Sequence, residues 1–236
     1  EGGKWYAYEV KASTKVKDIF VQDVALQYHV ITNCGIDLAD ISVIHLNNNY
    51  IKYGDLDIKQ LFTIQSVLDS VQSIQDYIIG QIEILKGVVA SNEEPELEMG
   101  KHCHNPYDCD FIGYCTDLDP FNEFVPIDQV VNINIGGINE FLSELVYPLQ
   151  YMDFETYMVA VPEHDGHWPY RQVPFQFSLH IESKGQKTLK HHQFIAKPGA
   201  NPSKEFIETL LNAISGHGSI VVYNKAFENT RLNELK

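Results

Sequence analysis

The sequence predicts a mixed α/β protein with two domains, and three observations lead to this prediction. Residues 4–12 alternate between apolar and polar side chains, as strands do, and the segment after them carries apolar residues at helical spacing. Three of the four cysteines crowd into residues 103–115, within a polar and turn-rich stretch. A second series of strands and helices then begins at residue 149.

The first domain is expected to cover residues 1–120. The Ser13-Thr14 pair is expected to cap its first helix, and Gly35 is expected to end that helix. The further elements expected here are a strand, a turn, a short extended piece, a long helix and a polar loop, at residues 41–46, 47–49, 61–64, 67–89 and 91–100.

A linker is expected at residues 121–148, with a short helix at 138–145, before a second domain at 149–236. Asn201 and Asn224 are expected to cap helices, because their side-chain oxygens can accept from free N–H groups of the first turn. The elements expected in this domain are three strands, a helix, a strand and a helix, at residues 149–154, 173–182, 189–196, 202–214, 219–223 and from 225 onward.

The charge and the ends of the chain limit the possible functions. With 17 basic and 32 acidic side chains, the formal net charge of −15 argues against bulk electrostatic binding of nucleic acid, unless the carboxylates gather around metal ions. No apolar run approaches the roughly 20 residues that cross a bilayer, so we expect a cytoplasmic protein without a membrane partner. Because the sequence starts at Glu1 and stops within a helical pattern, we expect an internal fragment of a longer protein.

A first candidate site lies on the first strand and the helix after it. Glu9 and Lys11 are two residues apart, so both are expected on one face, while Val10 enters the core on the other. A carboxylate can bind a divalent ion, and an ammonium can orient water or stabilise charge on a phosphate. The next helix carries Asp23 and Gln27.

This arrangement resembles the RecB-like branch of the PD-(D/E)XK nucleases, in which a Glu-x-Lys strand precedes a helix with a glutamine. The resemblance implies that Glu9 binds the metal, Lys11 is the catalytic lysine and Gln27 helps to set the site. It also implies a metal-binding aspartate upstream of this sequence. Ile31 stands where the family usually has a tyrosine.

The cysteine segment predicts a second metal site. Cys103, Cys109 and Cys115 are separated by five residues twice, and thiolates grouped in this way suit a soft metal or an iron–sulfur cluster. The spacing differs from the paired C-x-x-C of zinc ribbons, which makes Zn²⁺ the second choice. Pro106 and Gly113 are expected to let the chain loop back around the metal.

The same segment resembles the carboxy-terminal cluster motif of iron–sulfur RecB-like nucleases, including the CRISPR-associated ones. The resemblance implies a [4Fe–4S] cluster whose fourth cysteine lies upstream of this sequence. Cys34, His102 and His104 are alternative fourth ligands, and the sequence leaves the choice open.

A third candidate site lies in the second domain. Asp153 and Glu155 occupy alternate positions of an apolar strand, where two like charges on one face are costly unless a cation neutralises them. Glu228 follows Asn224 in the first turn of the last helix. These residues resemble the first two motifs of DEDD 3′-5′ exonucleases of the RNase H-like fold, which implies that all three carboxylates are catalytic and bind Mg²⁺ or Mn²⁺. Glu228 replaces the usual aspartate.

The order of these features resembles a bacterial domain-of-unknown-function family that fuses an iron–sulfur RecB-like domain to an RNase H-like exonuclease domain. Residues 106–109 and 169–180 add to the resemblance. It implies a metal-dependent nuclease that hydrolyses DNA or RNA at single-stranded ends, and the fragment alone is expected to be inactive. Two alternatives stay open: a catalytically degenerate module that binds single strands by stacking, and a zinc-stabilised structural protein.

Overall fold

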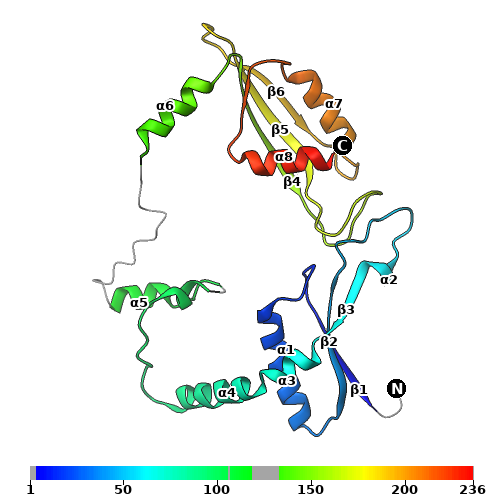
Figure 1. Cartoon of the computed structure of the whole chain (residues 1–236), viewed down its shortest axis with the longest axis vertical. Helices are drawn as coiled ribbons and strands as arrows, with labels where there is room; N and C mark the ends of the chain where they lie inside the picture. The colour runs from blue at the N-terminus through cyan, green and yellow to red at the C-terminus, as the bar shows by residue number, and fades with distance from the viewer. Residues whose placement is uncertain (1–3, 106, 119–132, 236) are drawn as a thin grey trace. The chain divides into compact units, whose positions relative to one another are not determined.

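The computed structural model describes residues 4–105, 107–118 and 133–235 (Figure 1). The chain forms two compact units, one made of Glu1–Ile79 with Ser143–Lys236 and the other of Gly80–Leu142. The larger unit contains two β-sheets, so the structure is mixed α/β as the sequence predicts. Within the described part of the chain, no helix is both long enough and apolar enough to cross a membrane.

The first sheet has the order β1-β2-β3, and the helix α1 follows its first strand. β1 pairs with β2 in parallel, and β2 pairs with β3 in the antiparallel sense. Both the first strand and the strand at residues 41–46 are therefore confirmed. The bounds are β1 (Trp5–Val10), α1 (Asp18–Asn33), β2 (Leu38–Leu46) and β3 (Phe62–Ser66).

The two ends of α1 differ in how well the sequence predicts them. Ser13 does not cap the helix: its hydroxyl donates to the Lys15 carbonyl, and Lys17, which offers no side-chain cap, precedes the first turn. Gly35 ends the helix as expected, with φ of +80° and its N–H donating to the Thr32 carbonyl. A residue without Cβ adopts this left-handed conformation readily.

The core of the first sheet lies on the face that carries Glu9 and Lys11. Glu9 is paired in register with Val43, which is fully buried, and Lys11 contacts Asp23 on α1. Val10 projects from the opposite face and is 65% exposed. The expectation that Val10 enters the core is therefore wrong, because α1 covers the other face of β1.

The long helix expected at residues 67–89 is interrupted. It consists of α3 (Leu68–Ser73) and α4 (Gln75–Ala90), with Ile74 between them at φ −109° and ψ +10°, outside helical geometry. A single-turn helix, α2 (Ile58–Leu61), precedes β3, and the Asp57 carboxylate caps it by accepting from two backbone N–H groups.

The smaller unit is helical where it is described. Cys103 lies in the turn η1 (Lys101–His104), Cys115 lies in the helix α5 (Ile112–Leu118) and Cys109 lies between the two elements. The polar loop before η1 is present as expected. The expected helix at 138–145 is observed as α6 (Ile135–Glu144), which extends beyond this unit. Much of the expected linker, residues 119–132, lies outside the described residues, as does Pro106.

Residues 149–235 form the second sheet and its two helices, and all six elements that the sequence predicts for this part of the chain are present. The order of the sheet is β6-β5-β4-β7, where β4, β5 and β6 are antiparallel neighbours and β7 lies parallel to β4. The Asn224 side chain caps the last helix by accepting from the Phe227 N–H, as expected. Asn201 accepts from the Ser203 N–H but lies one residue before the cap position of α7, which Pro202 occupies without a side-chain cap. The bounds are β4 (Leu149–Tyr157), β5 (Val173–Glu182), β6 (Lys190–Ile195), α7 (Ser203–Ala213), β7 (Ser219–Val221) and α8 (Lys225–Glu234).

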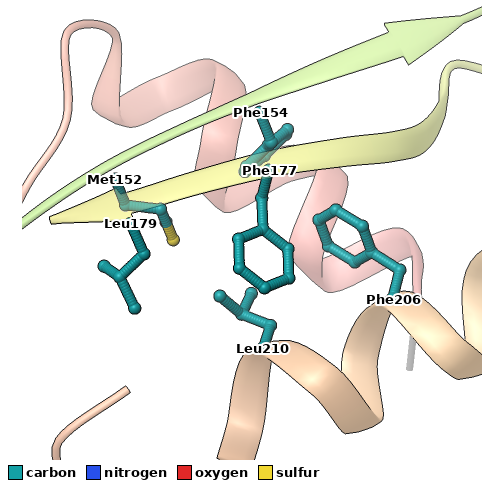
Figure 2. Close-up of a cluster of buried hydrophobic side chains, with 6 residues drawn as sticks. All are labelled: Met152, Phe154, Phe177, Leu179, Phe206 and Leu210. Atoms are coloured by element: carbon teal, nitrogen blue, oxygen red, sulfur yellow. The ribbon is translucent and has the colours of Figure 1, made fainter. Parts of the chain in front are cut away.

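One face of this sheet is covered by α7 and α8. Figure 2 shows Phe154 and Phe177 of the sheet pointing towards Phe206 of α7, with ring centroids 5.8 Å and 5.6 Å from Phe206. Phe227 of α8 packs against the same cluster. Side chains alternate along a strand. Asp153 and Glu155, on either side of Phe154, therefore project from the face opposite to the two helices.

Within the larger unit, the loop between β4 and β5 contacts the segment after β2. The backbone N–H of Lys52 donates to the His167 carbonyl at 2.9 Å, and the N–H of Gly166 donates to the Lys52 carbonyl at 2.8 Å. The Asp165 carboxylate accepts from the Lys52 ammonium at 3.1 Å and from the Gly54 N–H at 2.9 Å. These bonds lower the pKa of Asp165, because they favour its charged form.

Candidate functional site

The first candidate site is a cluster of charged and amide side chains between β1 and α1. The Lys11 ammonium lies 2.9 Å from a Glu9 carboxylate oxygen and also donates to the Asp23 carboxylate. The Gln27 amide nitrogen lies 3.5 Å from the other Asp23 oxygen. The structure thus brings Glu9, Lys11 and Gln27 around one place, with Asp23 between lysine and glutamine.

Lys11 is the charged centre of this cluster. Its hydrogen bond to Asp23, followed by that to Glu9, raises its pKa above the usual lysine value, and partial desolvation opposes this only in part. Lys11 therefore carries a positive charge at neutral pH and is suited to stabilise negative charge on a ligand. The side chains of Lys11, Glu9 and Asp23 are 20%, 27% and 43% exposed, so the cluster is open to solvent on one side.

Asp23 is the site residue that sequence reasoning left without a role. It stands four residues before Gln27, and residues with this spacing are neighbours on one helix face. This spacing is the feature of the sequence from which the proximity of Asp23 to Gln27 could have been predicted. The pairing of Asp23 with Lys11 could not be read from it, because it depends on how α1 packs against β1.

The cysteines occupy three different environments. Cys103 is buried, Cys115 is half-buried and Cys109 is exposed, and all are free thiols. The backbone brings two of them near each other, because the Cys109 N–H donates to the Cys103 carbonyl at 2.8 Å. Cys34, an alternative ligand, is exposed after α1 and belongs to the other compact unit.

The carboxylates of the third candidate site lie in contrasting surroundings. Asp153 and Glu155 are exposed on the face of β4 that faces away from α7 and α8. Glu228 is buried in the first turn of α8, and its Oε2 atom has no hydrogen-bond partner among the described residues.

In the described part of the chain, no three or more His, Cys, Asp or Glu side chains are close enough together to hold a metal ion. The structure therefore does not gather Cys103, Cys109 and Cys115 into one cage, and we derive no step through a metal cluster there. It does not gather Asp153, Glu155 and Glu228 either. The roles assigned to both sets stay predictions.

Comparison with known proteins gives one result for the second sheet. Residues 150–236 match the family model described as "Domain of unknown function (DUF2779)". The match covers β4 to α8, including Asp153, Glu155 and Glu228. No curated protein and no solved structure matches the chain. The similarity supports the expected domain-of-unknown-function family for this part of the chain.

Proposed function

We propose that the protein is a divalent-metal-dependent nuclease that hydrolyses phosphodiester bonds of DNA or RNA. The observation that carries this proposal is the Lys11 ammonium shared between the carboxylates of Glu9 and Asp23. A surface ion pair alone contributes little to stability, usually below about 1 kcal/mol, so stability gives little reason to place three charges together. Phosphodiester hydrolysis uses such groups, because carboxylates hold a cation and an ammonium stabilises charge on the phosphate.

The donor set at this site fits Mg²⁺ or Mn²⁺. Mg²⁺ is usually bound through one or two carboxylates, and waters and substrate phosphates complete its coordination. Glu9 and Asp23 would supply the two carboxylates, and the metal would supply an activated water. Gln27 would hold the orientation of the Asp23 carboxylate through its amide. Because the pKa of Lys11 is raised, Lys11 would stabilise charge and would not act as a base.

The arrangement of elements supports two nuclease-like parts. In the first sheet a strand with Glu-x-Lys is followed by a helix with glutamine, as the RecB-like resemblance implies, and the strand after that helix lies parallel to the first. Three antiparallel strands, a helix, a parallel strand and a helix follow in the second, as the RNase H-like resemblance implies.

The second candidate function is 3′-5′ exonuclease activity in the second sheet, and Glu228 favours it. A buried carboxylate oxygen without a partner is costly when the group is charged, and a bound cation would offset that cost. The Asp153 and Glu155 carboxylates project from the face of β4 that faces away from α8, so they do not meet Glu228 in this structure, and their part in this second function is a prediction that Asp153→Asn tests.

The test measures cleavage of end-labelled DNA and RNA strands in Mg²⁺ or Mn²⁺ by the purified complete protein that contains this sequence, because the fragment alone is expected to be inactive. Lys11→Met should lower the cleavage rate at least about 100-fold, since losing one charge-stabilising group in a hydrolytic site has roughly that effect. Lys15→Met is the matched control, because Lys15 is an exposed lysine between β1 and α1, and its replacement should leave the cleavage rate unchanged.

Three results would separate the alternatives. Equal rates for the Lys11 and Lys15 variants would refute the first site. Loss of mononucleotide release in Asp153→Asn alone would assign the activity to the second sheet. Strand binding without cleavage in any metal would favour the degenerate binding module.

A further inference from the structure

One segment of this acidic chain has the opposite charge. Residues 183–204 contain five of the chain's 17 lysine and arginine residues and two histidines, and none of its 32 acidic residues. The segment comprises the β5–β6 hairpin turn, the strand β6 and the loop that leads into α7. A basic stretch within a chain of net charge −15 marks a local binding surface for an anion.

Four of the five lysines of this segment form no salt bridge within the described residues, whereas Lys204, in the first turn of α7, pairs with Glu208 at 3.9 Å. Lys184, Lys187 and Lys190 are exposed, and none of the salt bridges within the described residues uses them. The same holds for Lys197 after β6. By contrast, Lys11 and Lys52 each pair with a carboxylate. The ammonium groups of Lys184, Lys187, Lys190 and Lys197 can therefore contact a ligand.

Two cavities lie at the two ends of β6. The first, of about 550 Å³, is lined by Lys184, Lys190, His192 and His217, and by hydroxyl or amide groups of Ser183 and Asn212. Its lining contains no carboxylate. Cations surrounded by neutral hydrogen-bond donors are suited to bind a phosphate group.

The second cavity, of about 410 Å³, follows the end of the strand and combines Lys197 and His164 with the aromatic rings of Tyr157 and Phe175. The two ring centroids are 6.1 Å apart. Glu163 is the one carboxylate in its lining. Aromatic rings beside a cation can stack a base while the cation contacts the backbone.

We propose that the β5–β6 hairpin and these two cavities bind the phosphate backbone of a single-stranded nucleic acid along β6. The six residues of β6 span about 20 Å, and single-strand-binding modules typically cover about 4 to 16 nucleotides. Concave sites with aromatic rings fit a strand with bases better than a flat lipid surface. The choice of nucleic acid as the polyanion rests on the proposed nuclease function.

The test measures the affinity of a fluorescent single-stranded oligonucleotide of about 12 nucleotides by anisotropy, in EDTA so that cleavage cannot occur. The variant is Lys184→Gln/Lys190→Gln. Its matched control is Lys15→Gln/Lys59→Gln, which removes two exposed lysines from the first sheet's connections. All four lysines are exposed, so thermal midpoints should stay at the parent value.

The hairpin variant should bind roughly 10- to 30-fold more weakly at about 0.1 M salt, since each phosphate contact contributes a slope of about 0.7 in log affinity against log salt. The control should bind like the parent. Equal loss in both variants would show bulk electrostatics and overturn the proposal, as would the absence of oligonucleotide binding. The proposal would also be overturned, in favour of a membrane surface, if the hairpin variant lost binding to phosphatidylserine vesicles but still bound the oligonucleotide like the parent.

This experiment separates the two proposals. If the hairpin variant loses binding while the parent never cleaves in Mg²⁺ or Mn²⁺, the strand-binding surface stands and the nuclease function fails. If the parent cleaves and the hairpin variant binds normally, the nuclease function stands and this surface is wrong.

Discussion

His167 should make the stability of the protein depend on pH between about 4 and 6.5. Its side chain is 4% exposed, in the β4–β5 loop that contacts Lys52. Burial, followed by the nearby Arg171 guanidinium and the His164 ring, lowers the pKa of His167 from 6.5 to about 4. The folded protein therefore keeps this imidazole neutral where an unfolded chain would protonate it.

The size and the sign of this change in the free energy of unfolding follow from the linkage between protonation and folding. Between these two pKa values the unfolded state binds the additional proton, so the free energy of unfolding falls as the pH falls. A shift from 6.5 to about 4 corresponds to at most about 3.5 kcal/mol, since one pKa unit is worth about 1.4 kcal/mol. The contribution of His167 is complete above pH 6.5 and is lost progressively towards pH 4.

Urea unfolding at several pH values between 4.5 and 7.5 should measure this effect, with His167→Gln as the perturbation. The parent should lose about 2 kcal/mol between pH 7 and pH 5, and the variant should lose that much less over the same interval. His102→Gln is the control, because His102 is exposed. Parallel pH profiles for the parent and His167→Gln would refute the reasoning.

Three further outcomes are expected. Phe206→Ala should lower the free energy of unfolding by about 3 to 5 kcal/mol in denaturant titration, because Phe206 is fully buried against the second sheet. Gly218→Ala should destabilise the protein more than Gly35→Ala in thermal unfolding: both glycines have positive φ, but of the two only Gly218 has a backbone oxygen, that of Pro148, where the added Cβ would lie. The sequence-based [4Fe–4S] hypothesis predicts iron and labile sulfide in anaerobically purified complete protein, which Cys103→Ser should remove; zinc without iron would reject the [4Fe–4S] assignment and leave a zinc site, and the absence of both metals would agree with the separated cysteines of the structure.

The strands and helices around the second sheet, though not the order of its strands, could be predicted from the sequence. Apolar alternation located β4, β5 and β6 to within a few residues, and Asn224 marked the start of α8 because its side chain caps that helix. These signals are local: each depends on residues within one strand or one turn. The break at Ile74 was missed, because the apolar pattern of residues 67–89 continues across it.

The candidate sites could be predicted only in part. The period of a strand places Glu9 and Lys11 on one face, and the structure confirms that they are in contact. Spacing could not show that Asp23 would complete the ion pair. It also could not show that Glu228 is buried while Asp153 is exposed, because the burial of a carboxylate depends on the elements packed around it.

The sequence by itself determined which side chains share a face, where the main strands and helices lie and where charge is segregated along the chain. The tertiary structure decided which face became the core. The alternation of side chains along a strand does not show which of its two faces is buried, so the pattern fits equally well with Val10 or Glu9 inside. In the structure α1 packs on the side of Glu9, and Val10 is exposed. Contacts between residues far apart in the sequence determine which face of β1 is buried. A face is buried only where another element covers it, and local sequence patterns do not predict the position of that element.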